Sequence, residues 1–281
     1  MASMNDLATA AIASSAVQMA KWSSAGDEAG GGGGATESSA VSGATPQPPE
    51  VARGALITLE GLDRSGKTTQ VKLLEQRFVE LGRKVKVMRF PDRSTPIGEM
   101  IDSYLRSQVD MDDHVIHLLF SANRWEAVKA ITTLLASGTT VICDRYYHSG
   151  IVYSAAKRNP ALTLSWARAP EVGLPRPDLV LFLDLAEAQA RARGGWGGEV
   201  YERGEMQRRV RELFWGLSAG RVEEGLSGEA ELRLSQEEED LHVVDASPSV
   251  EDVAEEIWKV VRPRVEAVER GELGRTVRKV S

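Results

Sequence analysis

A glycine-rich loop between an apolar run and a helix-like segment constrains the fold of this chain more than any other feature. Residues 61–70 read GLDRSGKTTQ and follow the apolar run ALITLE of residues 55–60. Gly61, Gly66, Lys67 and Thr68 satisfy the pattern G-x-x-x-x-G-K-[ST], in which the backbone N–H groups curl around phosphates. The following helix would point its positive dipole end at the same phosphates. The loop therefore predicts a site for a nucleoside triphosphate.

The residue types in this loop favour a kinase over a nucleotide-driven switch. Lys67 would reach the β- and γ-phosphates, and the hydroxyl of Thr68 could ligate Mg²⁺. Ser65 and Thr69 lie in the same stretch and join the predicted ATP-binding residues. A GTP-driven switch would also carry an N-K-x-D segment that reads guanine, and the sequence contains none. The loop indicates a nucleoside triphosphate as the donor but leaves the acceptor open.

Strand-like and helix-like segments alternate from residue 54 onward, which favours a parallel sheet covered on both faces. Short apolar runs predict strands at 55–60, 84–90, 139–144, 177–185 and 241–247. Helical spacing predicts helices at 67–82, 97–107, 113–138, 202–217 and 249–270, with candidates at 147–158 and 162–169. The expected fold class is α/β, a P-loop NTPase-type three-layer fold with a five-stranded parallel sheet flanked by helices.

The first 50 residues differ in composition from the rest and are predicted to form a disordered tail. They are rich in Gly, Ser, Ala and Pro, so they bury too little apolar surface to offset the entropy of ordering. Residues 51–281 are expected to form one P-loop domain. Within that domain, residues 219–240 lose the periodicity and are acidic, which indicates a solvated insertion.

Composition limits the partners and compartments that we expect. The net charge of −7, with no dense basic patch, argues against nucleic-acid binding. No apolar run reaches membrane-spanning length, and the single cysteine, Cys143, excludes an internal disulfide. Residues 1–52 hold no arginine and five acids, unlike a mitochondrial transit peptide. A cytoplasmic location is expected, with the nucleus as a further possibility.

Three arginines lie where parallel strands are expected to end. Arg64 lies in the glycine-rich loop, Arg93 in RFPDRS (89–94) and Arg145 in DRYYHSG (144–150). Ligands of open parallel sheets bind beyond the carboxyl ends of the strands, so these guanidiniums should face one crevice. Three positive groups there, in a chain of net negative charge, indicate a second anionic group besides the triphosphate.

Six segments between residues 53 and 270 resemble the thymidylate kinase family. In chain order they are GLDRSGKTTQ, RFPDRSTPIG, HLLFSANRWE, DRYYHSGIVYSAAK, GLPRPDLVLFLDL and YERGEMQ. Their order and spacing are similar to those of the eukaryotic members. The resemblance implies phosphoryl transfer from ATP to dTMP, giving ADP and dTDP in dTTP biosynthesis, with Mg²⁺ as cofactor.

The resemblance also implies which residues hold dTMP. Phe120 would stack on thymine, Arg124 would donate to its O4, and Tyr153 would crowd the 2′ position of the sugar. Arg93 and Arg145 would clamp the 5′-phosphate, while Ser149 and Gly150 would line the thymine side. The implied dTMP-binding residues are Asp63, Phe90, Arg93, Phe120, Arg124, Arg145, Ser149, Gly150, Tyr153, Tyr201 and Gln207.

The remaining implied roles concern ATP, the metal ion and the transfer step. Asp63 would hold the sugar 3′-hydroxyl while Arg64 faces the migrating phosphoryl group. The implied catalytic residues are Asp63, Arg64, Lys67 and Arg145. The implied ATP-binding residues are Gly61, Ser65, Gly66, Lys67, Thr68, Thr69 and Arg193. Thr68 and Asp144 would hold Mg²⁺.

A mobile lid is expected at residues 191–202, RARGGWGGEVYE, because its glycines favour motion and its closure would exclude water. Arg193 resembles the residue that packs on adenine. The lid departs from the family at Val200, where members often carry arginine. The resemblance implies that Arg64 makes this departure tolerable.

Two other functions remain open from the sequence alone. One is a kinase of broader pyrimidine monophosphate specificity, and the other is an inactive relative that only binds nucleotide. The intact Asp63, Arg64, Lys67, Thr68 and Arg145 argue against the inactive relative. The family is typically homodimeric through packed helices, and the apolar segment 113–138 is compatible with a homodimer.

Overall fold

The computed structural model describes residues 52–193, 199–201, 204–218 and 240–281 of the 281-residue chain. The predicted tail at 1–50 lies outside the described residues. Of the predicted lid, only 191–193 and 199–201 are described, and of the predicted insertion only Asp240.

The described chain forms the parallel sheet that the sequence predicts. Its five strands are β1 (Leu56–Gly61), β2 (Val85–Arg89), β3 (Thr140–Asp144), β4 (Leu179–Asp184) and β5 (Leu241–Asp245). They lie in the order β2-β3-β1-β4-β5, and every neighbouring pair is parallel. This order places the carboxyl ends of β2, β3 and β1 side by side. In register, Asp144 at the end of β3 lies between Leu59 of β1 and Arg89 of β2.

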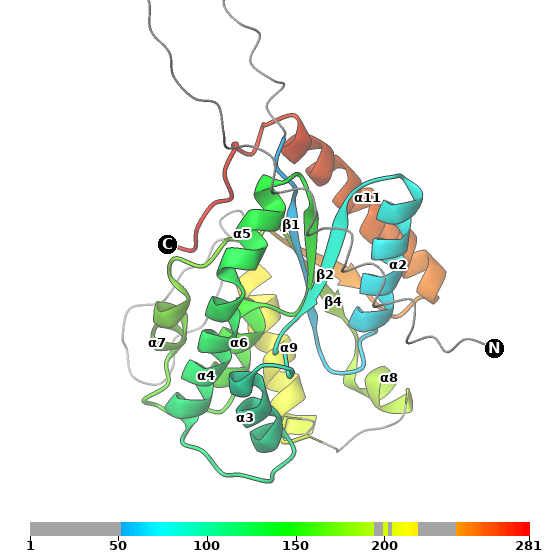
Figure 1. The fold of residues 1–281 in the computed structure, drawn as a ribbon. Coiled ribbons are helices and arrows are strands. Elements are labelled where there is room, and N and C mark those ends of the chain that lie inside the picture. Colours follow the sequence, from blue (N-terminus) through cyan, green and yellow to red (C-terminus); the bar gives the residue numbers. More distant parts are fainter. Residues whose placement is uncertain (1–51, 194–198, 202–203, 219–239) are drawn as a thin grey trace, which may run out of the picture. The chain divides into compact units, whose positions relative to one another are not determined.

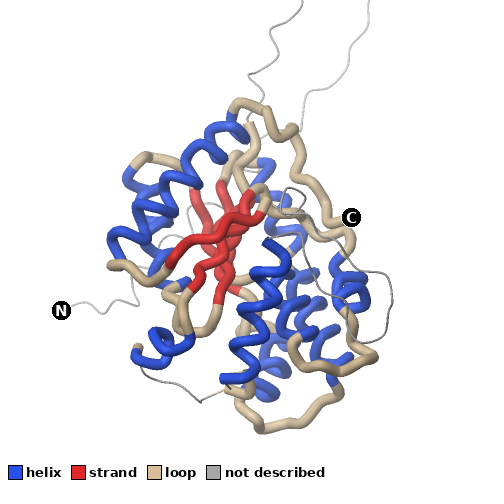
Figure 2. Tube along the Cα trace, turned by 180° about the vertical axis from the view of Figure 1, so that it is seen from behind, coloured by secondary structure: helices blue, strands red, loops and turns tan. Residues whose placement is uncertain are grey.

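Helices cover both faces of the sheet (Figures 1 and 2). On one face lie α2 (Lys67–Glu80) and α11 (Val250–Glu269). On the other lie α5 (Val128–Ala136), α6 (Tyr147–Ala155) and α9 (Gly204–Ser218). The remaining elements are α3 (Pro96–Leu105), α4 (Asp113–Glu126), α7 (Leu164–Arg168), the 3₁₀ helix η1 (Ala169–Glu171) and α8 (Glu187–Ala192). None of the described helices is long and apolar enough to cross a membrane.

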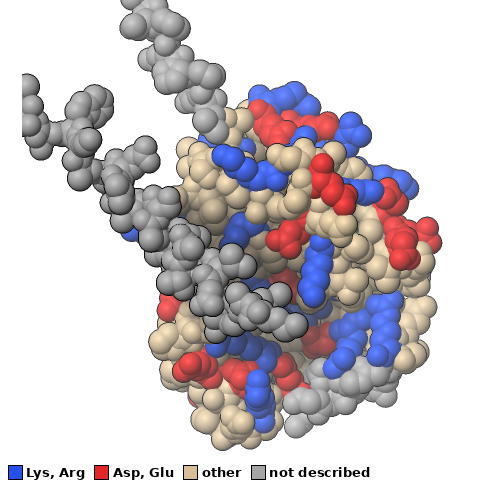
Figure 3. Space-filling view, turned by 45° about the vertical axis from the view of Figure 1, so that its right-hand side comes forward, with Lys and Arg blue, Asp and Glu red and all other residues tan. Residues whose placement is uncertain are grey.

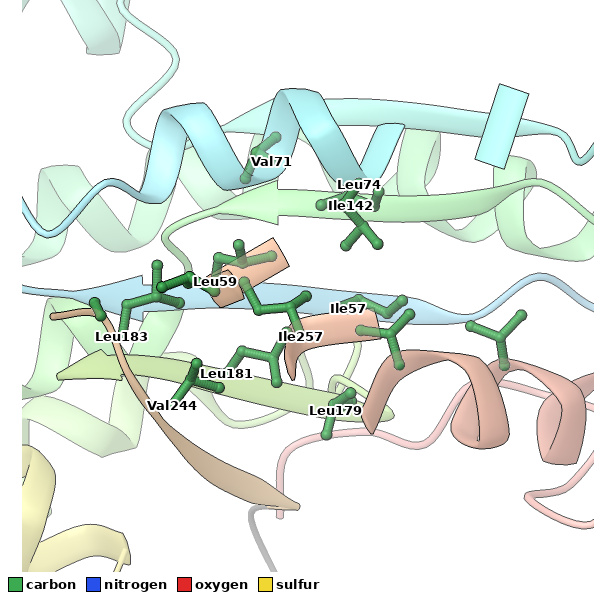
Figure 4. Close-up of a cluster of buried hydrophobic side chains, with 14 of the residues drawn as sticks. Ile57, Leu59, Val71, Leu74, Ile142, Leu179, Leu181, Leu183, Val244 and Ile257 are labelled. Atoms are coloured by element: carbon green, nitrogen blue, oxygen red, sulfur yellow. The ribbon is translucent and has the colours of Figure 1, made fainter. Parts of the chain in front are cut away.

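Burial of both sheet faces explains why the three inner strands, β1, β3 and β4, are nearly continuous buried runs, whereas the edge strands β2 and β5 carry partly exposed residues. Ile57 and Leu59 of β1 pack against α2 and α11, whereas Leu56 joins the cluster on the opposite face. Figure 4 shows the first of these clusters, with Leu181 of β4 and Ile257 of α11 between sheet and helix. Each fully buried aliphatic side chain contributes about 1.5–3 kcal/mol. This packing fixes the strand ends from which the site is built.

Helical spacing predicts one long helix over residues 113–138, and this prediction is wrong. The structure has two helices, α4 and α5, which meet at Ala127. The backbone N–H of Ala127 bonds to the carbonyl of Arg124 three residues back, so the helix tightens there. The two halves pack on different neighbours, because α4 lies against α3 and α6 while α5 lies against β3. The junction contains neither proline nor glycine, so no local signal marks it in the sequence.

The C-terminal residues pack back onto the loop before β4. Lys279 forms an antiparallel bridge with Pro175, and the side chain of Val280 is buried. Near them, Arg53 donates to the carbonyl oxygens of Leu273 and Gly274 and forms a buried two-bond ion pair with Asp178, with both distances at 2.8 Å. This pair lies before the first residues of β1 and β4, at the end of the sheet opposite the strand ends described above.

Candidate active site

One cavity of about 650 Å³ collects residues that follow β1, β2, β3 and β5. Nearly all of the residues predicted from the sequence line it: Asp63, Arg64, Ser65, Gly66, Lys67, Thr68, Thr69, Phe90, Arg93, Phe120, Arg124, Asp144, Arg145, Ser149, Gly150, Tyr153, Arg193 and Tyr201. Ala246 and Pro248 add a wall after β5. The expectation that segments distant in sequence converge at the strand ends is confirmed.

The loop between β1 and α2 has a backbone that suits phosphate binding. Gly66 has a φ of 97° directly before Lys67 begins α2. An added Cβ at Gly61 would lie 2.7 Å from the carbonyl oxygen of Leu183, so the chain leaves the sheet through a gap that only glycine fits. Arg64 has a φ of 68°, which strains a residue with a side chain. The N-terminus of α2 therefore faces the cavity.

Lys67 lies buried beneath this loop. Its Nζ donates to the carbonyl oxygen of Leu62 at 2.5 Å. Burial, followed by the positive charge of Arg145, lowers the pKa of Lys67 to about 7. Phosphate oxygens beside the amine would favour its charged form. The loop thus holds a cation whose charge is best compensated by an anion in the cavity.

Thr68 and Asp144 form the part of the site that suits a divalent cation. The Thr68 hydroxyl donates to Asp144 Oδ2 at 2.7 Å, and only 4% of Asp144 is exposed. Hydroxyl and carboxylate oxygens are ligands that Mg²⁺ prefers. Among the described residues, no group of three or more His, Cys, Asp or Glu is placed to hold a metal ion. A cation here would therefore complete its coordination with phosphate and water oxygens.

Asp63 and Arg145 form an ion pair at the centre of the cavity. Burial alone would raise the pKa of Asp63, but the positive charges of Arg145 and Lys67 hold it below its usual value. Arg145 Nη1 also donates to the carbonyl oxygen of Gly61 at 3.0 Å and to Ser149 Oγ at 3.1 Å. Arg145 itself has a φ of 67°. These contacts aim its guanidinium from β3 toward the phosphate loop.

Arg93 reaches the same cavity from the loop after β2. Two carboxylates hold it, Asp102 of α3 at 2.5 Å and Glu199 at 2.7 Å. Burial would lower the pKa of Arg93, but the bond to Glu199 and both charges raise it above its usual value. Glu199 therefore occupies N–H donors of Arg93 that a phosphate could also bind.

The other end of the cavity is aromatic. Phe90 is buried and lies 5.4 Å from the Tyr146 ring, and Phe120 is partly buried beside α3. Tyr153 of α6 lies under the guanidinium of Arg145, with 5.2 Å from Arg145 Cζ to the ring centre. Arg124 of α4 is only 2% exposed and pairs with Glu171 of η1. This end can stack a planar ring and offer N–H donors to its edge.

Outside the cavity, basic and acidic side chains are interspersed on the face that Figure 3 shows. The positive groups of the cavity therefore reflect local placement and not a broadly basic face.

The comparisons with known proteins agree with this geometry. A family model described as thymidylate kinase matches residues 59–224, more than half of the chain. The chain belongs to the thymidylate kinase family. It is 44% identical to the thymidylate kinase of Homo sapiens, over 73% of this chain and 88% of that protein. It is 46% identical to the thymidylate kinase of Schizosaccharomyces pombe, over 74% of this chain and 92% of that protein. It is 42% identical to the thymidylate kinase of Arabidopsis thaliana, over 78% of this chain and 75% of that protein.

The solved structures give the same result for the fold. The structure of thymidylate kinase from Candida albicans superimposes with a TM-score of 0.67 at 33% identity, covering 82% of this chain and 99% of that one. The predicted P-loop NTPase-type fold is therefore confirmed.

Two residues that the family resemblance assigned to dTMP serve other side chains in this structure. Gln207 is fully buried; its Nε2 donates to Asp63 Oδ2 and to the Tyr201 carbonyl oxygen, each at 2.8 Å, and its Oε1 accepts from the Asp63 N–H at 3.1 Å. Ser149 lines the cavity, but its hydroxyl donates to Glu60 at 2.5 Å and accepts from Arg145. Both residues thus orient the central pair, and their contacts with dTMP stay predictions.

Three glutamates of this thymidylate kinase family member were missed by the sequence reasoning. Glu60 is fully buried at the end of β1 and accepts from the N–H groups of Tyr146 and Ser149. Glu199 pairs with Arg93, and Glu171 pairs with Arg124. Only Glu60 had a signal in the sequence, because it directly precedes Gly61, the first residue of the phosphate loop. Glu199 lies in the predicted lid, but nothing in that segment indicates a pairing with Arg93, and Glu171 lies in a segment without a recognisable pattern.

Proposed function

We propose that this chain transfers the γ-phosphoryl group of ATP to dTMP, giving ADP and dTDP in dTTP biosynthesis. One observation carries the proposal. A single cavity joins a phosphate loop, two arginines placed for a second phosphate, and an aromatic end with a buried arginine. The donor and acceptor can therefore meet inside one cavity.

The geometry supports catalysis by positioning and charge neutralisation, which is what phosphoryl transfer mostly requires. Lys67 and the N-terminus of α2 would hold the donor phosphates. Arg93 and Arg145 would hold the acceptor phosphate, and Asp63 would anchor the sugar. Arg64, at the tip of the loop, would face the group in transit. An arginine in this role contributes roughly 10³–10⁵ in rate in other phosphoryl-transfer enzymes.

Mg²⁺ is the cofactor that the site fits. Thr68 and Asp144 would hold it, directly or through water, and their oxygen donors match its preference. When bound, it would neutralise charge on the donor phosphates. Activity with ATP should therefore be lost with EDTA and restored by added Mg²⁺.

An acceptor panel tests the function and separates it from its alternatives. ADP production should be measured with ATP, Mg²⁺ and each of dTMP, dUMP, dCMP, UMP, CMP and AMP. Preference for dTMP supports the proposal. Equal use of dTMP, UMP and CMP would support a broader pyrimidine kinase, and broad substrate specificity is ascribed to the Candida albicans enzyme. If none of the acceptors raises ADP production, the chain is an inactive relative.

We also propose that the protein forms a homodimer through α4. Val115, Leu118 and Trp125 lie on its outer side and are 48%, 47% and 41% exposed, and Val172 beside them is 49% exposed. A second copy would remove this apolar surface from water. Light scattering should give twice the monomer mass, and Leu118→Asp should halve it. Monomeric wild-type protein at micromolar concentration would contradict the proposal.

A further inference from the structure

The most completely buried charged pair of the cavity lies at its aromatic end. Arg124 Nε donates to Glu171 Oε2 at 2.9 Å, and Arg124 Nη2 donates to Glu171 Oε1. The Glu171 side chain is fully buried, and that of Arg124 is 2% exposed. A two-bond arginine–carboxylate contact fixes the plane of the guanidinium as well as its position.

Neighbouring groups also pack closely around the guanidinium of Arg124. An added Cβ at Gly150 of α6 would lie 2.6 Å from Arg124 Nη2 and 3.1 Å from Nη1, so the guanidinium lies directly against the α6 backbone. His117 Nε2 lies 4.0 Å from Glu171 Oε1, the oxygen that Arg124 Nη2 bonds, and His117 Nδ1 lies 2.7 Å from Ser154 Oγ. Burial, followed by the charge of Arg124, lowers the pKa of His117 to about 4. His117 is therefore neutral near pH 7, and the Glu171 carboxylate is left to Arg124.

We infer that Glu171 is a positioning residue that makes Arg124 a reader of a carbonyl oxygen and so sets the preference for 4-oxo over 4-amino pyrimidines. The inference rests on the proposed dTMP kinase function and names the structural basis of its base selectivity. Glu171 neutralises the charge of Arg124, so this arginine suits a neutral base edge better than a phosphate.

Hydrogen-bond chemistry gives the selectivity its direction. The N–H groups of Arg124 that Glu171 does not bind can only donate. Thymine and uracil both carry the acceptor O4, whereas cytosine carries a 4-amino group that donates. A site built to bond one group rejects the base that lacks it, because its buried donors are left unpaired. The thymine methyl group plays no part in this contact.

The test compares wild-type protein with Glu171→Gln. Glutamine keeps the size but places an amide N–H₂ against a donor of Arg124, which breaks the two-bond contact. We expect the dTMP-to-dCMP ratio of kcat/KM to fall about tenfold, the equivalent of one hydrogen bond to a charged group. The change should appear in KM for dTMP more than in kcat. The dTMP-to-dUMP ratio should stay unchanged, because both bases carry O4.

Asp178→Asn supplies a matched control. It breaks the other buried arginine–carboxylate pair, with Arg53, far from the cavity. Like Glu171→Gln it should lower thermal stability, but it should leave both nucleotide ratios at their wild-type values. A purely structural role for Glu171 would make the two variants behave alike, which would overturn the inference.

A second measurement avoids any variant that fails to fold. In a crystal structure of the wild-type protein with dTMP, the Arg124–Glu171 contact should persist, with another Arg124 N–H bonded to O4. A complex in which Arg124 leaves Glu171 or does not contact the base would overturn the inference. If wild-type protein phosphorylates neither dTMP nor dUMP, the proposed function itself fails, a result distinct from an active enzyme whose ratios ignore Glu171.

Discussion

The two ends of the cavity use the same side chain in opposite ways. At the aromatic end, Arg124 is 2% exposed and shares two hydrogen bonds with the fully buried Glu171. At the phosphate end, the side chains of Arg145 and Asp63 are 16% and 26% exposed, and Lys67 adds a second positive charge beside them. The pair of Arg124 is closed to solvent, whereas the pair of Arg145 is partly exposed in the cavity.

The difference shows that an arginine in a cavity does not by itself indicate an anionic ligand. What matters is how deeply the arginine and its carboxylate partner are buried. A fully buried pair offers only directed donors, whereas a partly exposed guanidinium can also bind a phosphate that enters the cavity. Variants at each end can show whether one end determines the rate of dTMP phosphorylation and the other the preference for the base.

The largest effect is expected from Arg145→Ala at the phosphate end. Because this residue would contact the transferred or accepting phosphate, kcat/KM for dTMP should fall by roughly 10³. The dTMP-to-dCMP ratio should stay at the wild-type value, since the base end is untouched. Steady-state kinetics check this, with Arg262→Ala, in an exposed pair on α11, as the control. A loss below tenfold would show that Arg145 is not part of the transfer machinery.

A smaller effect, on stability, is expected from Arg124→Met. Removing one partner leaves Glu171 as an uncompensated buried charge, which should cost about 3 kcal/mol of unfolding free energy. The double variant Arg124→Met with Glu171→Leu should recover most of this loss, because no buried charge remains. Urea denaturation measures both. Equal stability of the single and double variants would contradict the picture of an isolated, internally compensated pair.

His117 should give the aromatic end its own pH dependence. Its pKa is about 4 when folded, against an ordinary value of 6.5, so the unfolded chain binds the proton more readily. This contribution is present above pH 6.5 and is lost as the pH falls toward 4. Between pH 7 and pH 5, wild-type protein should lose about 2 kcal/mol more than His117→Gln. Urea denaturation at the two pH values measures the unfolding free energy. If wild-type protein and His117→Gln lose the same amount between pH 7 and pH 5, the pKa of His117 is not lowered.

The smallest effect is expected from Ser149→Ala, which decides to which end Ser149 belongs. Its hydroxyl joins Glu60 to Arg145, so its loss should loosen Arg145 and raise KM for dTMP about fivefold, near 1 kcal/mol. The dTMP-to-dCMP ratio should not move. If that ratio changes instead, Ser149 contacts the base, as the family resemblance implied.

The parts of the molecule that could be predicted from the sequence are those determined by local pattern. The phosphate loop is one, because glycine spacing, a lysine and a following helix lie within ten residues. The five strands are another, because burial on both faces makes the inner strands apolar runs and the edge strands β2 and β5 still carry β-branched residues. Strand ends differ from the predictions by at most two residues.

The parts that could not be predicted depend on tertiary contacts. The break at Ala127 follows from the different neighbours of α4 and α5. Glu171 lies 47 residues from Arg124, and no sequence signal pairs them. The hydrogen bond from Gln207 to Asp63 depends on how α9 packs against the loop after β1. Residue type and family motif indicated the site, but not which side chains support it.

Arg64 and Arg145 combine a guanidinium with a backbone that glycine adopts more easily, with φ values of 68° and 67°. At Arg64, a selection for thermal stability alone would favour glycine, since the replacement relieves backbone strain. At Arg145, glycine would relieve the same strain but leave the Asp63 carboxylate without its partner. Each replacement would also remove a positive charge that the proposed transfer step uses. Laboratory evolution or computational redesign of this chain should therefore hold both positions fixed, because a more stable product could be reached by discarding the chemistry.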